Sequence, residues 1–288
     1  MIVFGELPHT GTDVSQRWER RKDKYKVRPP EERIDPSRYD VEPILQGPAK
    51  TYIETHHYSG SYPAARLNVG LFERQLHGQG RRLVGVCVFS VPMQKAVIPK
   101  YAPALTPIEG VELGRLVLGD EVPFYGETFF VSRAFRVLEA EKPDVKFIVS
   151  YSDPVPRKAE DGSLVMPGHV GTIYQALNAR YFGRGSRRGL WMDSSGLVLS
   201  ERMLHKVRTE DSRMGYGIRQ LLASGAPPKT FGESYADWVT RALDTGPFSK
   251  VMHPGNHVYG WGLGRWKRKL VMAQAAPAYP KQKDVLVQ

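Results

Sequence analysis

The sequence predicts a mixed α/β fold, of the α+β kind, in which helices flank a central sheet. The apolar runs "RRLVGVCVFSVP" (81–92) and "VELGRLVLGD" (111–120) have the alternation and length of strands. Residues 127–141 then show a helical period, and "VKFIVSY" (145–151) has the continuous apolar character of a strand covered on both faces. With 41% hydrophobic residues among 288, the chain can bury a core of this kind.

The remaining elements follow in chain order. Residues 1–48 are basic and proline-bearing without a sustained period, which indicates a partly disordered arm. In the strand at 111–120, strict alternation places Arg115 on the same face as Val111, Leu113 and Val117. After the strand at 145–151, a loop leads to a second predicted helix over 172–182, with Tyr174, Asn178 and Tyr181 along one polar stripe.

The C-terminal half predicts further elements. The stretch "RGLWMDSSGLVLSERML" (188–204) favours a hairpin, residues 212–245 favour two helical pieces, and residues 257–272 favour a closing strand. We therefore divide the chain into an arm at 1–48, a catalytic core at 49–210, a helical insertion with the closing strand at 211–272, and a polar tail at 273–288.

The charge of the chain favours a polyanionic partner. Its 41 Lys and Arg residues against 30 Asp and Glu residues give a net charge of +11. Three basic clusters carry aromatic residues that can stack on bases, although solvated basic faces would look the same: 17–28, 179–188 and 265–269.

Other classes of protein are disfavoured. No run of 18 apolar residues exists, and "MIVFGELPHT" lacks a basic segment followed by a long apolar one. We expect a protein of the cytoplasm, in an unspecified oligomeric state and without a membrane partner. The single cysteine, Cys87, lies in an apolar run, which favours a buried and unreactive thiol and excludes a disulfide within the chain.

Two motifs carry polar groups at places suited to a site. The turn in "THHYSGSYP" (55–63) contains His57 and Tyr58, and is either part of a site or an ordinary solvated turn. In "SYSDP" (150–154), Asp153 follows a buried strand, where it could be a metal ligand, a base or the start of a turn. Together, His57, Tyr58 and Asp153 offer nitrogen and oxygen donors suited to iron.

A third motif, "GHVGTIYQALNARYFG" (168–183), places glycines and a histidine at a helix start. Tyr174 there could donate a proton to a leaving group, or be a core tyrosine with a satisfied hydroxyl. No P-loop, G-x-G-x-x-G, G-x-S-x-G, H-E-x-x-H or zinc-type Cys/His spacing is present, which disfavours the mechanisms that depend on them.

These motifs in this order resemble the Mom-like DNA modification proteins of bacteriophages, a divergent branch of the GNAT acyltransferase fold. The stretches that carry the resemblance are "HHYSGSYP", "LNVGLFE", "RRLVGVCVFSVP", "ELGRLVLGDEVP", "SYSDP", "GHVGTIYQALNARYFG" and "HPGNHVYGWGLG". The resemblance implies a GNAT-like mixed sheet with flanking helices. It also implies an enzyme that adds a carbamoylmethyl group to the exocyclic amine of adenine in double-stranded phage DNA, which protects that DNA against restriction.

The resemblance also assigns residues. It implies catalytic roles for Tyr58, Ser132, Asp153 and Tyr174, binding of acetyl-CoA or another acyl donor by Arg115 and Ser132, and binding of iron by His57 and Asp153. This chain departs from the pattern in two places. The segment "GDEVPFYGETFF" (119–130) lacks the glycine-rich turn of ordinary GNAT enzymes, and the loop between Asp153 and Gly168 is longer than usual.

Two other functions are open at this level. An ordinary GNAT N-acetyltransferase acting on a small-molecule or protein amine would bind acetyl-CoA and leave DNA unchanged. A non-catalytic DNA-binding phage protein would need the basic clusters but not His57, Asp153 or Tyr174.

Overall fold

The computed structural model of the chain describes residues 15–17, 26–28, 31–75, 80–166, 168–267 and 276–281. The chain forms two compact units. The first comprises residues 1–154, 168–184 and 256–288, and the second comprises residues 155–167 and 185–255. Each unit is described by itself.

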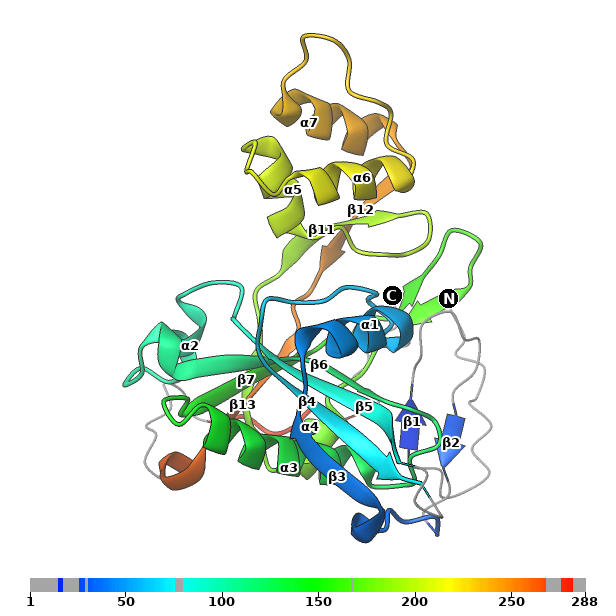
Figure 1. Cartoon of the computed structure of the whole chain (residues 1–288). Helices are drawn as coiled ribbons and strands as arrows, with labels where there is room; N and C mark the ends of the chain where they lie inside the picture. Colours follow the sequence, from blue (N-terminus) through cyan, green and yellow to red (C-terminus); the bar gives the residue numbers. More distant parts are fainter. Residues whose placement is uncertain are drawn as a thin grey trace. The chain divides into compact units, whose positions relative to one another are not determined.

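A seven-stranded sheet forms the centre of the first unit (Figure 1). Its order is β10-β13-β7-β6-β5-β4-β3, and neighbouring strands are antiparallel except for the parallel pair β6 and β7. The strands are β3 (Tyr39–Pro43), β4 (Ala65–Arg74), β5 (Arg81–Ser90), β6 (Gly110–Leu118), β7 (Phe147–Ser152), β10 (Arg180–Arg184) and β13 (His257–Gly262). The predicted mixed α/β sheet is therefore confirmed.

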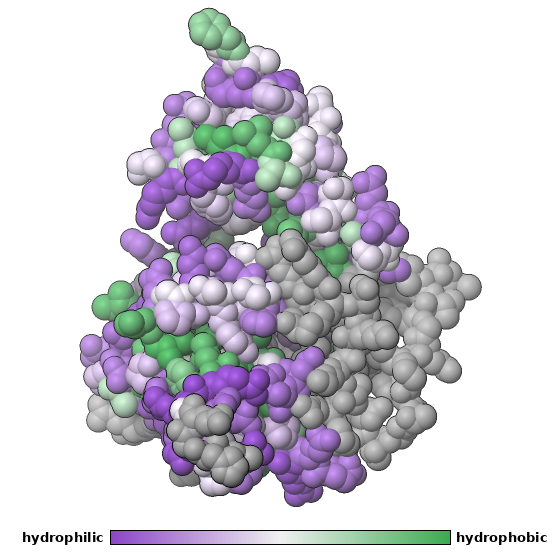
Figure 2. All heavy atoms as spheres, turned by 45° about the vertical axis from the view of Figure 1, so that its right-hand side comes forward, coloured by the Kyte–Doolittle hydropathy of each residue, from purple (hydrophilic) through white to green (hydrophobic). Residues whose placement is uncertain are grey.

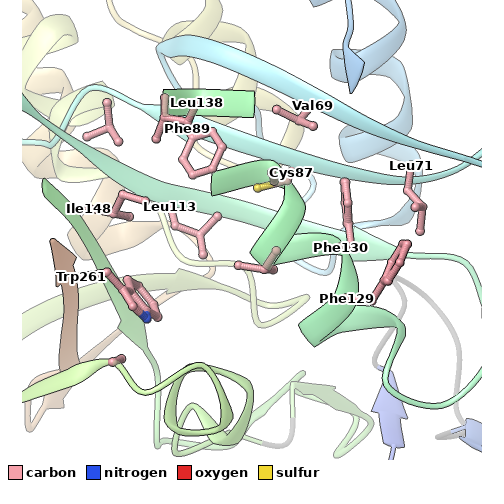
Figure 3. Close-up of a cluster of buried hydrophobic side chains, with 14 of the residues drawn as sticks. Val69, Leu71, Cys87, Phe89, Leu113, Phe129, Phe130, Leu138, Ile148 and Trp261 are labelled. Carbon is pink, nitrogen blue, oxygen red and sulfur yellow. The ribbon is translucent and has the colours of Figure 1, made fainter. Parts of the chain in front are cut away.

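Helices cover both faces of this sheet, because alternate residues of its strands point to opposite faces and both sets are apolar. On one face, α1 (Gln46–His56) buries Ala49 and Ile53 against Val86 and Val88 of β5. On the other face, α3 (Gly126–Glu141) buries Phe130 and further apolar residues against the residues of β5 that alternate with those valines, Cys87 and Phe89 (Figure 3). The buried and unreactive Cys87 matches the prediction, since burial raises the pKa of its thiol. Two short helices, α2 (Val97–Tyr101) and α4 (Thr172–Ala176), complete the unit.

A β-bulge changes which side chains of β6 share a face. Leu113 pairs with Phe89 and Arg115 pairs with Val88, so Gly114 has no counterpart on β5. The alternation therefore shifts by one residue at this point. Val111 and Leu113 lie in the core on the α3 side, whereas Val117 packs with the cluster under α1. The prediction that Arg115 shares a face with Val111 and Leu113 is wrong for this reason.

The second predicted helix is also corrected. Helix α4 ends at Ala176, and Asn178 has a left-handed backbone (φ 55°), which asparagine tolerates better than most residues. The chain then enters β10, where Tyr181 is buried and its hydroxyl lies 2.7 Å from His257 Nδ1. Tyr181 is therefore a core residue, and the predicted stripe of Tyr174, Asn178 and Tyr181 does not form.

Part of the predicted polar tail packs on this region. The Gln175 side-chain amide donates to the Pro280 carbonyl at 3.1 Å, and the Tyr279 hydroxyl donates to the Ala179 carbonyl at 2.5 Å. Pro280 is buried. Residues 276–281 thus hold α4 and the start of β10 in place.

The second unit contains three helices around its own core. They are α5 (Glu201–Arg208), α6 (Gly215–Ala223) and α7 (Tyr235–Thr245). Helices α6 and α7 confirm the two helical pieces expected within 212–245. Trp238 is fully buried at the centre of this core, and its indole N–H donates to the Pro227 carbonyl at 2.7 Å. On the face drawn in Figure 2, hydrophilic residues surround smaller hydrophobic patches.

The predicted hairpin at 188–204 forms only over its first part. The chain reverses at residues 194–196, where Asp193 accepts hydrogen bonds from Ser195 and Leu197, and Met192 then forms an antiparallel bridge with Val198. Strand β11 (Arg188–Asp193) pairs along its whole length with β12 (Phe248–His253), and the end of the predicted range enters α5. A small ribbon of β8 (Arg157–Lys158) and β9 (Leu164–Met166) belongs to the same unit.

The two units do not follow the domain boundaries drawn from the sequence. The range 1–48 contains β3 and the paired short strands β1 (Ser15–Arg17) and β2 (Lys26–Arg28), and the helical unit comprises residues 155–167 and 185–255. Most of the basic cluster at 17–28 and part of that at 265–269 lie outside the described residues. Among the residues described, no helix is long and apolar enough to cross a membrane.

Candidate functional site

The candidate site lies where the two parallel strands of the sheet stop pairing. β6 and β7 pair only from Gly110 with Phe147 to Glu112 with Val149, although both strands continue beyond these residues. The Ser150 hydroxyl then donates to the Leu113 carbonyl at 3.0 Å, in place of a backbone bond. Side chains from both faces of the sheet can approach each other at such a point.

The turn after α1 contributes the first groups. The rings of His57 and Tyr58 lie 4.2 Å apart, and the Ser59 backbone N–H donates to His57 Nδ1 at 3.1 Å. Arg115 donates from Nε to the Ser61 carbonyl at 3.0 Å and from Nη2 to the Ser61 hydroxyl at 2.8 Å. The turn is therefore attached to β6, and burial lowers the pKa of Arg115 although its charge interacts favourably with Tyr58.

Glu112 is a candidate that the sequence analysis missed. It occupies the last position of β6 that pairs with β7, and it is partly buried. The bulge between β6 and β5 follows at Gly114. Burial raises the pKa of its carboxyl group to about 7, against the opposing charge of Arg115. A charged residue at an inner position of an apolar strand is a signal that the sequence did contain.

Tyr174 of α4 approaches the same point from the α3 side of the sheet. Its ring centroid lies 5.4 Å from that of Tyr259 and 5.6 Å from that of Trp261. Burial raises the pKa of the Tyr174 hydroxyl above its usual range, while a hydrogen bond with Ser150 opposes this rise. The charges of Tyr58 and Glu112 raise the pKa of Tyr174 further. A phenol in this environment stays protonated at neutral pH.

Asp153 and Ser132 are placed less directly. Asp153 follows β7, and its carbonyl accepts from the His169 N–H at 2.7 Å, which ties the segment before α4 to the end of the strand. Ser132 lies on α3, and its hydroxyl donates to the Phe129 carbonyl of the same helix at 2.9 Å. The roles assigned to these two residues stay predictions.

Iron binding finds no support in the described part of the chain. Among the residues that the structure describes, no group of three or more His, Cys, Asp or Glu side chains could hold a metal ion. Since His57 Nδ1 already accepts a hydrogen bond from Ser59, only the other ring nitrogen of His57 could serve as a ligand. We derive no chemical step through a metal.

The fold and site together define an α/β protein whose titratable side chains gather where two parallel strands part. The family model described as the Mom protein family matches residues 38–232, which is more than half of the chain. The chain belongs to the Mom protein family.

Two further similarities accompany this assignment. A curated relative, "Methylcarbamoylase mom" of Escherichia phage Mu, is 28% identical over 144 residues, which are 50% of this chain and 53% of the relative. The match thus spans about half the length of that protein. A solved structure, "Tandem GNAT protein from the clavulanic acid biosynthesis pathway (without AcCoA)", aligns with a TM-score of 0.38 at 9% identity, covering 78% of this chain and 99% of the other.

Proposed function

We propose that this protein is a DNA-modifying transferase that adds a carbamoylmethyl-type group to the exocyclic amine of adenine in phage DNA. The observations that carry the proposal are the attachment of Arg115 to the turn after α1 that contains Tyr58, and the electrostatic interaction of Glu112 and Tyr174 with Arg115, in a member of the Mom family. The name of the relative from phage Mu supports the choice of transferred group. Such a modification would protect the DNA against restriction in the cytoplasm of the host.

The proposed step needs a base, because the exocyclic amine of adenine must lose a proton when its nitrogen forms a new bond. Glu112 accepts that proton, since a carboxyl group with a pKa of about 7 is both ionised and basic near neutral pH. The nitrogen bonds to a carbon of an activated donor. The leaving group of that donor departs with the electron pair of the broken bond and takes a proton from the Tyr174 hydroxyl. Solvent then removes the proton from Glu112 and returns a proton to Tyr174.

Arg115 and Tyr58 orient the reactants in this proposal. The guanidinium group is held by Ser61 and by the Gly114 carbonyl, so its direction is fixed before the reactants bind. Its positive charge stabilises the negative charge that develops on the donor. Because adenine must leave the duplex stack at a cost of a few kcal/mol, the ring of Tyr58 provides a surface on which the base can stack.

The donor carries the carbamoylmethyl group on an activated methylene carbon, because that group is joined to nitrogen through its CH2 carbon. Acyl transfer from acetyl-CoA would give an acetamide instead. Glu127 lies in the first turn of α3. Its charge repels the pyrophosphate of CoA at the helix end where an anion would otherwise bind. A donor with a smaller or less charged leaving group therefore fits this helix end better than CoA.

The test is enzymatic digestion of DNA from expressing cells, followed by mass spectrometry of the nucleosides. We expect a heavier deoxyadenosine with the wild-type protein and none with Tyr174→Phe. Tyr101→Phe is the matched control, because it removes one hydroxyl from a buried tyrosine on the opposite face of the sheet. Unmodified adenine in a well-expressing native host would contradict the proposal, and equal modification by Tyr174→Phe would remove Tyr174 from the mechanism.

A further inference from the structure

The helical unit carries an exposed group of side chains that its own packing does not explain. Helices α5 and α6 bury their apolar residues, among them Met203 and Leu221, in the core around Trp238. Arg202 of α5, together with Tyr216 and Arg219 of α6, is exposed. Tyr216 is a large side chain with 48% of its surface accessible.

These three side chains are neighbours. Tyr216 and Arg219 are three residues apart on α6 and so lie on one face of the helix. The Arg219 side chain turns back toward the start of α6, since a Cβ atom on Gly215 would lie 3.7 Å from its Nη1. Helices α5 and α6 pack against each other, and the charge of Arg202 acts on the Tyr216 hydroxyl, opposing the rise in its pKa that burial causes.

Arg202 and Arg219 differ from Arg208 and Arg213 of the same unit, which have acidic partners. Arg208 pairs with Glu201 at 3.9 Å, and Arg213 pairs with Asp211 at 3.6 Å. Within the described residues, no carboxylate lies at ion-pair distance from Arg202 or Arg219. Two uncompensated guanidinium groups beside one exposed ring repel each other weakly in the free protein, and an anionic partner removes that repulsion.

We propose that Arg202, Tyr216 and Arg219 form a surface that contacts the sugar-phosphate backbone of double-stranded DNA. The inference rests on the proposed function, which makes DNA the substrate. Guanidinium groups bind phosphate through paired hydrogen bonds, and the ring between them packs against the sugar. The net charge of +11 favours a nucleic acid as the occupant over a protein surface of mixed charge. Backbone contacts of this kind position the enzyme without reading sequence.

The experiment measures binding of the full chain to a fluorescent duplex of about 30 base pairs by anisotropy, over a series of KCl concentrations. Arg202→Gln with Arg219→Gln removes two phosphate contacts, so the slope of log K against log salt should fall in magnitude by about 2. The matched control is Arg208→Gln with Arg213→Gln, which makes the same change in net charge at arginines that already have partners. The control should keep the wild-type slope.

Three results would overturn the inference: an unchanged slope in the first double variant, an equal loss in the control, or equally strong competition by poly-glutamate and duplex for wild-type protein. Circular dichroism confirms that each variant is folded. Because the assay needs no catalysis, its outcome is separate from the mass analysis of DNA. If the wild-type protein modifies adenine but the first double variant binds the duplex with the wild-type salt slope, the proposed surface is wrong and the proposed function still holds.

Discussion

Replacing Glu112 by glutamine should remove activity and at the same time stabilise the protein at neutral and alkaline pH. Burial raises the pKa of this carboxyl group from 4.5 to about 7. The folded state therefore holds the proton of Glu112 more tightly than the unfolded state does. Stability from this group is fully present below about pH 4.5, declines as the pH rises, and is lost above about pH 7.

The size of the effect follows from the same numbers. At about 1.4 kcal/mol for each pH unit, a rise from 4.5 to about 7 corresponds to at most about 3–4 kcal/mol. Glu112→Gln cannot ionise, so it avoids this cost. We expect its unfolding free energy to exceed that of wild type by up to about 3–4 kcal/mol at pH 8, and the difference to vanish near pH 4.5.

Urea unfolding of both proteins at pH 4.5, 6 and 8 measures this difference. The rate at which the wild-type protein modifies DNA should rise with pH and level off above about pH 7, because the ionised carboxylate of Glu112 is the base. Loss of general-base catalysis typically costs about 10²–10⁴ in rate. A variant that is no more stable than wild type at pH 8, or that keeps the wild-type pH–rate profile, would refute the reasoning.

Two further predictions concern the groups that hold the site and the helical unit. Ending the chain after Ala275 removes the contacts of Tyr279 and Pro280 with the region of α4, so modification should fall and the melting temperature should drop; Tyr279→Phe, which removes the bond from the Tyr279 hydroxyl to the Ala179 carbonyl, should show a smaller effect in the same assays. Trp238→Phe leaves the partly buried Pro227 carbonyl without its donor and should destabilise the helical unit by about 2 kcal/mol, measured by urea unfolding, whereas an unchanged midpoint would show that the bond is replaced.

The fold was predictable where the local pattern and the tertiary structure agree. Helix α3 spans Gly126–Glu141 against a predicted 127–141, because its apolar residues repeat at helical spacing over four turns and Pro143 follows. Residues 172–182 also show helical spacing, but only the first turn is a helix. The remainder contributes β10, since pairing with β13 buries Tyr181 and Phe182 more completely than a surface helix could.

Long-range pairing was the part that the local sequence could not supply. Strand β11 pairs along its length with β12, more than fifty residues later, whereas the nearby apolar run that the sequence offered contributes a single bridge, Met192 with Val198. Of the predicted site residues, the structure brings Tyr58, Arg115 and Tyr174 together, and it connects Asp153 through its backbone. It adds Glu112, which strand alternation alone gave no reason to select.

The bulge at Gly114 explains why the site could not be assembled from alternation. Without it, Arg115 would follow Val111 and Leu113 into the core on the α3 side, where a guanidinium group would have no water and few partners. The extra residue turns Arg115 to the face of Ser61 and Tyr58. A Cβ atom at position 114 would come within 2.4 Å of the Ser90 hydroxyl, so glycine is the residue that permits this geometry without moving β5.

The end of pairing between β6 and β7 then lets Tyr174 reach the same groups from the opposite face. The site therefore depends on two local departures from regular sheet structure, and both lie within three residues of Glu112.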